Sequence, residues 1–194
     1  MSVSTPTAED LDELFISCRY GDLEDIQQFV DRFGADHLNE IRDDNGNTVL
    51  HMVCANGHTE VLEYLLPKVS PSLLSAQNEA KSTPLHWAAV NSHLSIAQAL
   101  VRYRSGPGIT LIDIKNSAGR SPLGEAENVG WEEGAKWFVE VMNLDDGGKE
   151  EELRPANGTE NIEVEIQDAE GQVAKMSIGS RSKDQTVGGD ASTT

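Results

Sequence analysis

The sequence predicts an all-α solenoid of four stacked helix-turn-helix repeats with extended turns, followed by a mostly disordered acidic C-terminal extension. Two observations predict this fold class: a motif recurs in register about every 35 residues, and the composition changes over the last 50 residues. One repeat of this size cannot bury its own apolar face, whereas stacked copies can. We expect a repeat domain at 8–143, with repeats at about 10–42, 43–77, 78–114 and 115–143, and the extension at 144–194.

The two middle copies are the best preserved. Residues 44–66 read DNGNTVLHMVCANGHTEVLEYLL, and residues 79–100 read EAKSTPLHWAAVNSHLSIAQAL. Another copy at residues 117–138 reads SAGRSPLGEAENVGWEEGAKWF. A weaker copy lies upstream, where Cys18 aligns with Cys54. The chain therefore holds four related units.

Each unit begins its first helix with a predictable cap. Thr48, Thr83 and Ser121 stand where a hydroxyl can accept a hydrogen bond from the first turn of a helix. Pro84 and Pro122 follow directly, at the first helical position, where a missing N–H has no cost. These residues predict the starts of three first helices.

The first helices are short and are followed by an amphipathic second helix. Gly21, Gly57 and Gly130 stand where the first helix must end and the chain reverse, a position that favours left-handed backbone angles. Apolar residues at helical spacing come next. In the second copy these are Val61, Leu62, Leu65 and Leu66.

These residues resemble the ankyrin repeat, whose signature is G-x-T-P-L-H-x-A-A-x-x-G-H. STPLHWAAVNSH matches it almost completely and GNTVLHMVCANGH matches well, and the resemblance covers roughly residues 11–142. Lys81 replaces the turn glycine, Ser92 the helix-break glycine and Gly124 the motif histidine of the fourth copy. The first copy lacks the turn motif, as expected of a terminal cap.

Four histidines could suggest a metal-binding site, but their spacing argues against one. His51 and His58 lie seven residues apart, as do His86 and His93, but no cysteine or second carboxylate completes a ligand set. The resemblance implies instead that the motif histidine braces the turn by hydrogen bonds. No metal or cofactor is expected.

The two cysteines, Cys18 and Cys54, occupy the same slot in consecutive repeats. Packed helices place such equivalents about 8–10 Å apart, beyond the roughly 7 Å that a disulfide spans. We expect two buried thiols in a reducing compartment. No catalytic triad or phosphate-binding loop appears either, so the chain is not expected to be an enzyme.

The charge pattern indicates the kind of partner. The chain has 15 basic and 33 acidic residues, a net charge of −18, which argues against nucleic acid or an anionic membrane as primary partner and favours a basic protein. Residues 1–40 and 121–160 each carry −8, whereas residues 81–120 carry +4. The acidic excess could also serve solubility alone. Without a secretory signal or a long apolar run, we expect a cytoplasmic and nuclear protein.

The resemblance implies that a partner binds the turn tips and the outer face of the first helices. Trp87 stands out there, because with Met52 and nearby Tyr20 it could anchor an amphipathic helix in an apolar groove. Alternatively, Trp87 packs under a neighbouring turn. The partner-binding residues predicted in this way are Arg19, Tyr20, Asp44, Asn45, Asn47, Met52, Asn56, Glu79, Ser82, Trp87, Val90, Asn91, Arg120, Glu125 and Asn128.

Within the ankyrin family, the chain is similar to small fungal chaperones of the small-subunit ribosomal protein uS3. That resemblance implies a chaperone that binds the basic N-terminal helical region of uS3, keeps it soluble and supports ribosome biogenesis. We expect the chain by itself to be a monomer. Two alternatives stay open: a generic ankyrin adaptor or inhibitor that masks a basic segment of another protein, and an enzyme whose site is not recognisable in the sequence.

One stretch of the acidic extension shows strand-like alternation. Ile162, Val164 and Ile166 alternate with glutamates, and Val173 and Met176 follow a turn-like segment. The composition favours a solvated tail, but a weak hairpin, or a strand that forms on a partner, is the alternative.

Overall fold

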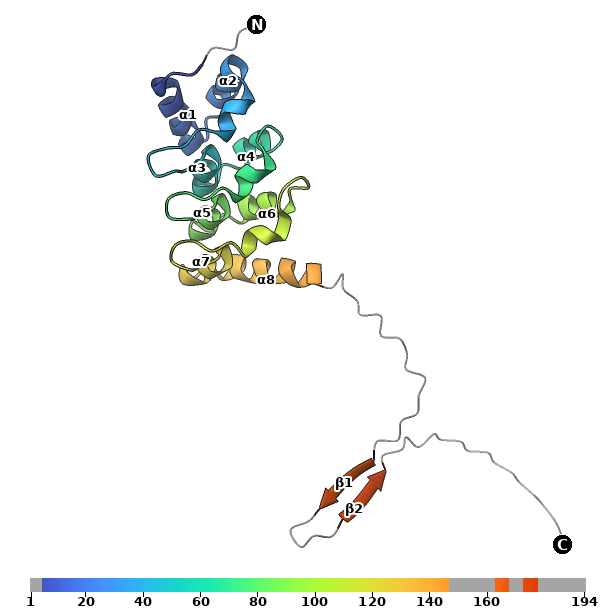
Figure 1. Ribbon diagram of the computed structural model, residues 1–194. Coiled ribbons are helices and arrows are strands. Elements are labelled where there is room, and N and C mark those ends of the chain that lie inside the picture. The colour runs from blue at the N-terminus through green and yellow to red at the C-terminus, as the bar shows by residue number, and fades with distance from the viewer. Residues whose placement is uncertain (1–4, 147–162, 168–172, 178–194) are drawn as a thin grey trace, which may run out of the picture. The chain divides into compact units, whose positions relative to one another are not determined.

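The computed structural model describes residues 5–146 and two strands at 163–167 and 173–177. Residues 5–146 form helical repeats as the sequence predicts (Figure 1). The helices are α1 (Ala8–Tyr20), α2 (Leu23–Phe33), α3 (Val49–Asn56), α4 (Thr59–Leu65), α5 (Pro84–Val90), α6 (Leu94–Arg102), α7 (Pro122–Asn128) and α8 (Glu132–Asp146). Short 3-10 helices lie in the connections: η1 (Ala35–Asn39), η2 (Pro71–Ser75) and η3 (Gly108–Ile112).

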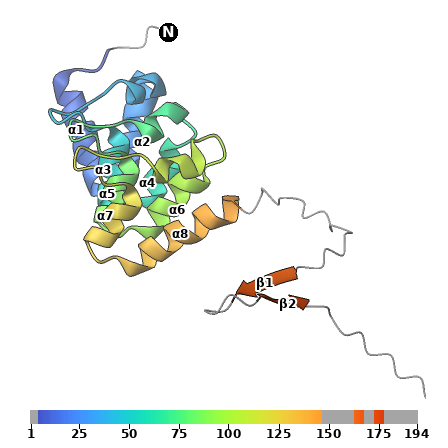
Figure 2. The same cartoon turned by 60° about the horizontal axis from the view of Figure 1, so that its bottom comes forward.

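The helices form two rows. The first helices α1, α3, α5 and α7 stack on one another in sequence, and the second helices α2, α4, α6 and α8 form the row behind them (Figures 1 and 2). Extended turns before α3, α5 and α7 project from the first row. Each pair of helices is one predicted repeat, so the four-repeat solenoid is confirmed. The last helix, α8, continues past residue 143 to Asp146.

The core lies between the two rows. Leu50 and Leu85 of the first helices are fully buried, as are Leu62 and Leu100 of the second helices. Full burial of such a side chain contributes about 1.5–3 kcal/mol. Cys18 and Cys54 are also buried in this core as free thiols, as expected.

The predicted helix starts and ends are confirmed. Thr48, Thr83 and Ser121 are the N-caps of α3, α5 and α7. Gly57 ends α3 at φ +78°, in the left-handed region. Ser92, which departs from the family pattern at the equivalent position of the next repeat, takes the same conformation at φ +61°. The backbone shape at this position is therefore kept even where glycine is lost.

The motif histidines connect each repeat to the next one. The backbone N–H of Thr48 donates to Nδ1 of His51 at 3.0 Å, so the proton of the neutral ring is on Nε2. That Nε2–H donates to the carbonyl oxygen of Ser82, in the following turn, at 2.9 Å. His86 repeats the arrangement with Thr83 and with the carbonyl oxygen of Arg120, at 3.1 Å each. The predicted bracing role is confirmed.

The second set of histidines connects each repeat to the preceding one. Nε2 of His58 bonds to the carbonyl oxygen of Arg19 at 2.8 Å, and Nε2 of His93 bonds to that of Ala55 at 3.1 Å. The His93 ring covers Gly57, where an added Cβ would lie 2.8 Å from it. Glycine is thus required there for space as well as for its backbone angles.

A separate unit of the chain holds a two-stranded antiparallel hairpin. Strand β1 (Glu163–Gln167) pairs with β2 (Val173–Ser177), with Glu163 opposite Ser177 and Val164 opposite Met176. The hairpin alternative therefore holds for these two segments. Residues 147–162, 168–172 and 178–194, where the sequence predicts disorder, lie outside the described residues.

Candidate protein interface

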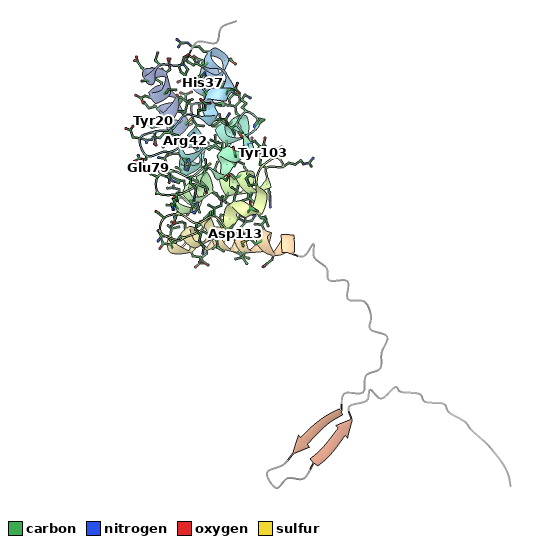
Figure 3. The ribbon with its side chains drawn as sticks, viewed as in Figure 1. Tyr20, His37, Arg42, Glu79, Tyr103 and Asp113 are labelled. Carbon is green, nitrogen blue, oxygen red and sulfur yellow. The ribbon has the colours of Figure 1, made fainter. Side chains whose placement is uncertain are left out.

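The predicted partner surface is built from the turn tips and the first-helix row. Consecutive tips are hydrogen-bonded to one another: the N–H of Glu79 donates to the carbonyl oxygen of Asn45 at 3.0 Å, and that of Ser117 donates to Ala80 at 2.9 Å. In Figure 3, Tyr20 and Glu79 lie at the edge formed by the first helices and the tips, whereas Tyr103 lies on the opposite side. The tips thus form one continuous ridge.

Most of the predicted residues have side chains that a partner can reach. Ser82 and Trp87 are half-buried. Ser82 supplies the carbonyl group that His51 binds. The exposed residues are Arg19, Tyr20, Asp44, Asn45, Asn56, Glu79, Val90, Asn91, Arg120 and Asn128.

The expectation that Asn47 faces a partner is corrected by its burial. Its side chain is buried, accepts a hydrogen bond from Nδ2 of Asn78 at 2.7 Å and donates one to the carboxylate of Asp43 at 2.9 Å. Asn78 holds in the following turn the position that Asp43 holds in this one, so the Asn47–Asn78 amide pair joins the turns of two neighbouring repeats. Its role in the fold leaves no polar atom directed at a partner.

Glu125 is corrected for the same reason. The residue is 5% exposed, and its carboxylate accepts a hydrogen bond from Nδ2 of Asn116 at 2.6 Å and pairs with Nε of Arg120 at 3.0 Å. A carboxylate so engaged stabilises the fourth turn, since buried charges are kept only where they are paired. Arg120 keeps its side chain 44% exposed.

Trp87 is packed partly against the neighbouring repeat. Its ring meets the ring of His51 edge to face, with centroids 6.3 Å apart. This contact places part of the indole against the preceding repeat, which agrees in part with the alternative that Trp87 packs under a neighbouring turn. The rest of the indole is accessible. Met52, the expected second anchor, is only 5% exposed.

A cavity of about 440 Å³ lies on this surface one repeat earlier than expected. We call it the first-turn cavity; it lies between α1, the turn before α3, and α3 itself. Leu11, Phe15 and Ile16 of α1 form its apolar wall, and Met52 lies at its base. Of the predicted residues, the structure brings Arg19, Asp44 and Met52 together here.

The charged lining of the first-turn cavity is three carboxylates and two guanidinium groups. Asp43 is engaged by the N–H groups of Asn45 and Asn47, at 2.9 and 2.8 Å. The guanidinium group of Arg42 is engaged by two backbone carbonyl groups. Asp12 and Asp44 are exposed and form no ion pair within the described residues, so they are available to a cationic partner.

Sequence reasoning missed Leu11, Phe15, Ile16 and Asp12, although the signal was present. These positions follow the i, i+4 and i+1, i+5 spacing of one helix face. The weaker first copy matches the other copies only from the end of α1 onward, so this face of α1 has no counterpart in the motif.

The titratable groups in the repeats favour a structural role over catalysis. Burial lowers the pKa of His51 to about 4 and also lowers that of His86, so both rings are neutral near pH 7. Burial raises the pKa of Cys18 to about 12 and that of Cys54 as well, which makes both thiols poor nucleophiles. Across the described residues, no cluster of three metal-ligating side chains is found. No helix among them is both long and apolar enough to cross a bilayer.

Comparisons with known proteins agree with this architecture. A family model described as ankyrin repeats, in three copies, matches residues 14–113. An ankyrin repeat-containing protein of Schizosaccharomyces pombe is 36% identical over 118 residues, which is 61% of this chain and 76% of that protein. The ankyrin repeat-containing protein YAR1 of Saccharomyces cerevisiae is 28% identical over 167 residues, 80% of each chain.

A solved structure shows one of these relatives bound to a partner protein. The crystal structure of the yeast ribosomal protein Rps3 in complex with its chaperone Yar1 contains a chain that matches this one with a TM-score of 0.64 and 28% identity. The match covers 70% of this chain and 95% of that chain. The match therefore includes nearly the whole of that chain.

Proposed function

The chain belongs to the ankyrin-repeat family, and on that premise we propose that it is a chaperone that binds the basic N-terminal region of newly made ribosomal protein uS3. The observation that carries this proposal is the similarity to YAR1 over 80% of both chains, together with the solved complex of Rps3 with its chaperone Yar1. In this role the chain is a protein-interaction module without catalysis.

The first-turn cavity supports a basic amphipathic client. Its apolar wall at Leu11 and Phe15 can receive an apolar side chain of a client helix. Asp12 and Asp44 beside it can contact lysine or arginine side chains on the same helix. Because residues 1–40 carry a net charge of −8, a cationic client is also attracted from a distance.

Binding of this kind protects the client. A ribosomal protein away from RNA has a high positive charge and exposed apolar surface, and covering both keeps it soluble. The proposal includes escort of the client through the cytoplasm and into the nucleus. It also includes a monomeric chaperone, with one client bound to each chain.

The test uses charge reversal at exposed positions, which leaves the core intact. D12K/D44K changes the two available carboxylates of the first-turn cavity, and D36K/D113K changes two exposed aspartates outside it. Both double variants change the net charge equally. Binding of full-length uS3 to the full-length chain is measured by calorimetry.

We expect D12K/D44K to weaken uS3 binding more than tenfold and D36K/D113K to weaken it less than threefold. Equal losses of uS3 affinity in the two variants would show that the first-turn cavity is not part of the interface. The binding of an unrelated basic protein to the wild type is measured in the same way. If its affinity equals that of uS3, only the general role of an ankyrin adaptor remains.

A further inference from the structure

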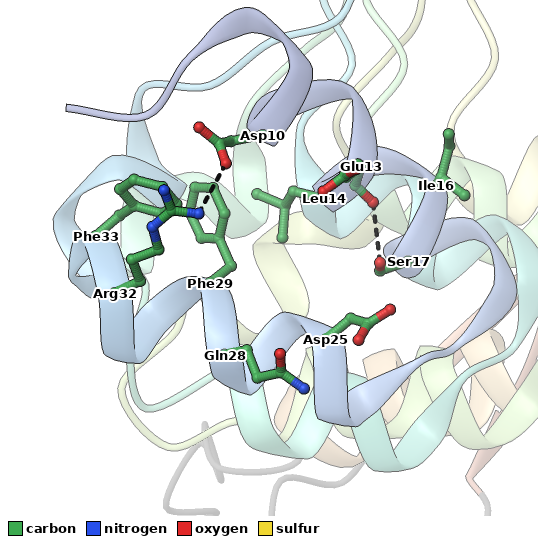
Figure 4. Close-up of a pocket in the computed structure, with 10 residues that line it drawn as sticks. All are labelled: Asp10, Glu13, Leu14, Ile16, Ser17, Asp25, Gln28, Phe29, Arg32 and Phe33. Atoms are coloured by element: carbon green, nitrogen blue, oxygen red, sulfur yellow. Dashed lines mark hydrogen bonds and ion pairs between the residues drawn. The ribbon is translucent and has the colours of Figure 1, made fainter. Parts of the chain in front are cut away.

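A second cavity lies on the other side of α1. It has a volume of about 390 Å³ and is enclosed by α1 and α2, the two helices of the first repeat (Figure 4). We call it the end cavity, because no repeat precedes α1 in the part of the chain that the structure describes. Its size falls in the range of ligand pockets.

The floor of the end cavity is apolar. Leu14, Phe29 and Phe33 line it, and the two phenylalanine rings pack with their centroids 4.9 Å apart. Ile16 also lines the cavity and is 55% exposed. Ile16 lines the first-turn cavity as well, so α1 lies between the two cavities and Ile16 borders both of them.

Two of the charged groups around the end cavity neutralise each other. Asp10 accepts a hydrogen bond from the backbone N–H of Thr7 at 2.8 Å and pairs with Nη1 of Arg32 at 3.2 Å (Figure 4). The guanidinium carbon of Arg32 lies 4.6 Å from the centre of the Phe33 ring. Arg32 is therefore held by Asp10 and Phe33 and does not compensate the other carboxylates.

Glu13 and Asp25 keep their negative charges available. Glu13 projects from α1 and Asp25 from α2, and both line the same cavity (Figure 4). Neither carboxylate forms an ion pair with another of the described residues. The cavity thus combines an apolar floor with two uncompensated anionic groups at its edge.

This combination fits one kind of occupant. A lysine or arginine side chain can lay its aliphatic stem on Leu14 and Phe29 and keep its cationic head near Glu13 and Asp25. An acidic segment would be repelled, and a purely apolar one would leave the carboxylates poorly solvated. The volume also admits an apolar neighbour of the basic residue.

We propose that the end cavity is a second binding site for a basic amphipathic segment, so that one client contacts α1 on both sides. The identity of the client rests on the proposed function, whereas the chemistry of the ligand rests on the cavity alone. The client surface then continues from the turn tips around α1 to the end of the repeat stack.

The test compares two neutralising double variants of the full-length chain. E13Q/D25N removes the two carboxylates of the end cavity, one from each helix. The matched control E9Q/E24Q removes two exposed carboxylates from the same helices that do not line it. Calorimetry measures full-length uS3 binding, and amide chemical shifts follow titration with a synthetic leucine–lysine peptide.

We expect E13Q/D25N to weaken uS3 binding about tenfold, since two partly exposed ion pairs are lost, and E9Q/E24Q to weaken it less than twofold. The peptide should shift amide signals of residues 25–33 in the wild type and the control, and not in E13Q/D25N. Equal affinity losses in the two variants, or unshifted signals in the wild type, would overturn the proposal. If uS3 fails to bind the wild type, the proposed function fails, and the peptide titration alone decides whether the end cavity binds a basic segment.

Discussion

The contact between Gly57 and the His93 ring of the next repeat can be measured by comparing alanine substitutions at Gly57 and at Gly130. Gly57 is the C-cap of α3 and Gly130 follows the C-cap residue of α7, and both lie in the left-handed region, at φ +78° and +74°. An added Cβ at Gly57 would lie 2.8 Å from the His93 ring, whereas nothing lies within 4 Å of one at Gly130. Gly130→Ala therefore perturbs only the backbone, and Gly57→Ala perturbs the backbone and the histidine above it.

The expected cost follows from these two contributions. A non-glycine residue in the left-handed region costs about 1–2 kcal/mol, which applies to both variants. In Gly57→Ala the His93 ring must also move, and the loss of its 3.1 Å hydrogen bond to Ala55 adds about 1 kcal/mol. We expect Gly57→Ala to lower the free energy of unfolding by about 2–3 kcal/mol and Gly130→Ala by about 1–2 kcal/mol.

Urea unfolding followed by circular dichroism measures these free energies. The same measurement on Gly57→Ala in a His93→Ala background separates the two contributions, because the clash is then absent. There the cost of Gly57→Ala should fall to that of Gly130→Ala. Equal costs for the two single variants, or an unchanged difference in the His93→Ala background, would refute the argument.

Four further predictions concern His51, the fourth turn and the interface. Because burial holds the pKa of His51 near 4, below its ordinary value of 6.5, the unfolded state takes up the proton first as the pH falls. The free energy of unfolding should drop by about 3 kcal/mol between pH 6.5 and pH 4, and urea unfolding should show most of this loss absent in His51→Gln. Glu125→Gln should lower that free energy by about 1–2 kcal/mol in urea without changing uS3 affinity by calorimetry, since its carboxylate pairs internally. Trp87→Ala should weaken uS3 binding by about 2 kcal/mol if the exposed part of its ring is an anchor, and unchanged affinity would exclude that role. Raising the salt concentration should slow uS3 association in stopped-flow measurements, and a flat dependence would count against electrostatic attraction.

The features that the sequence predicts well depend on neighbours close in the chain. Thr48 caps α3 through His51, three residues away, and Gly57 ends that helix through Val53, four residues away. Such contacts are part of the motif itself, so reading the motif is enough to place them. The same holds for the stacked helix pairs, since the apolar spacing recurs in each copy.

The features that the sequence does not predict depend on contacts that form only when a turn folds or when two repeats stack. Asn47 is buried because Asn78, 31 residues away, lies against it. Glu125 is engaged because the fourth turn places Asn116 and Arg120 around it. Both look like exposed polar residues in the sequence, where nothing marks their partners. The two cavities beside α1 were missed because the first copy lacks the motif that orients the other helices.

The fourth repeat changes both histidine positions, and this restricts how the array can be lengthened. Gly124 stands where His51 and His86 stand, so the repeat presents no imidazole to a following turn. Trp131 stands at the position of His93, and its indole covers Gly134 in the first turn of α8. A copy appended after α8 would find no histidine N–H to donate to the carbonyl group of its turn, whereas a duplicate of residues 78–114 inserted ahead of Lys115 would bring its own histidine. Engineers who extend this scaffold should therefore insert internally.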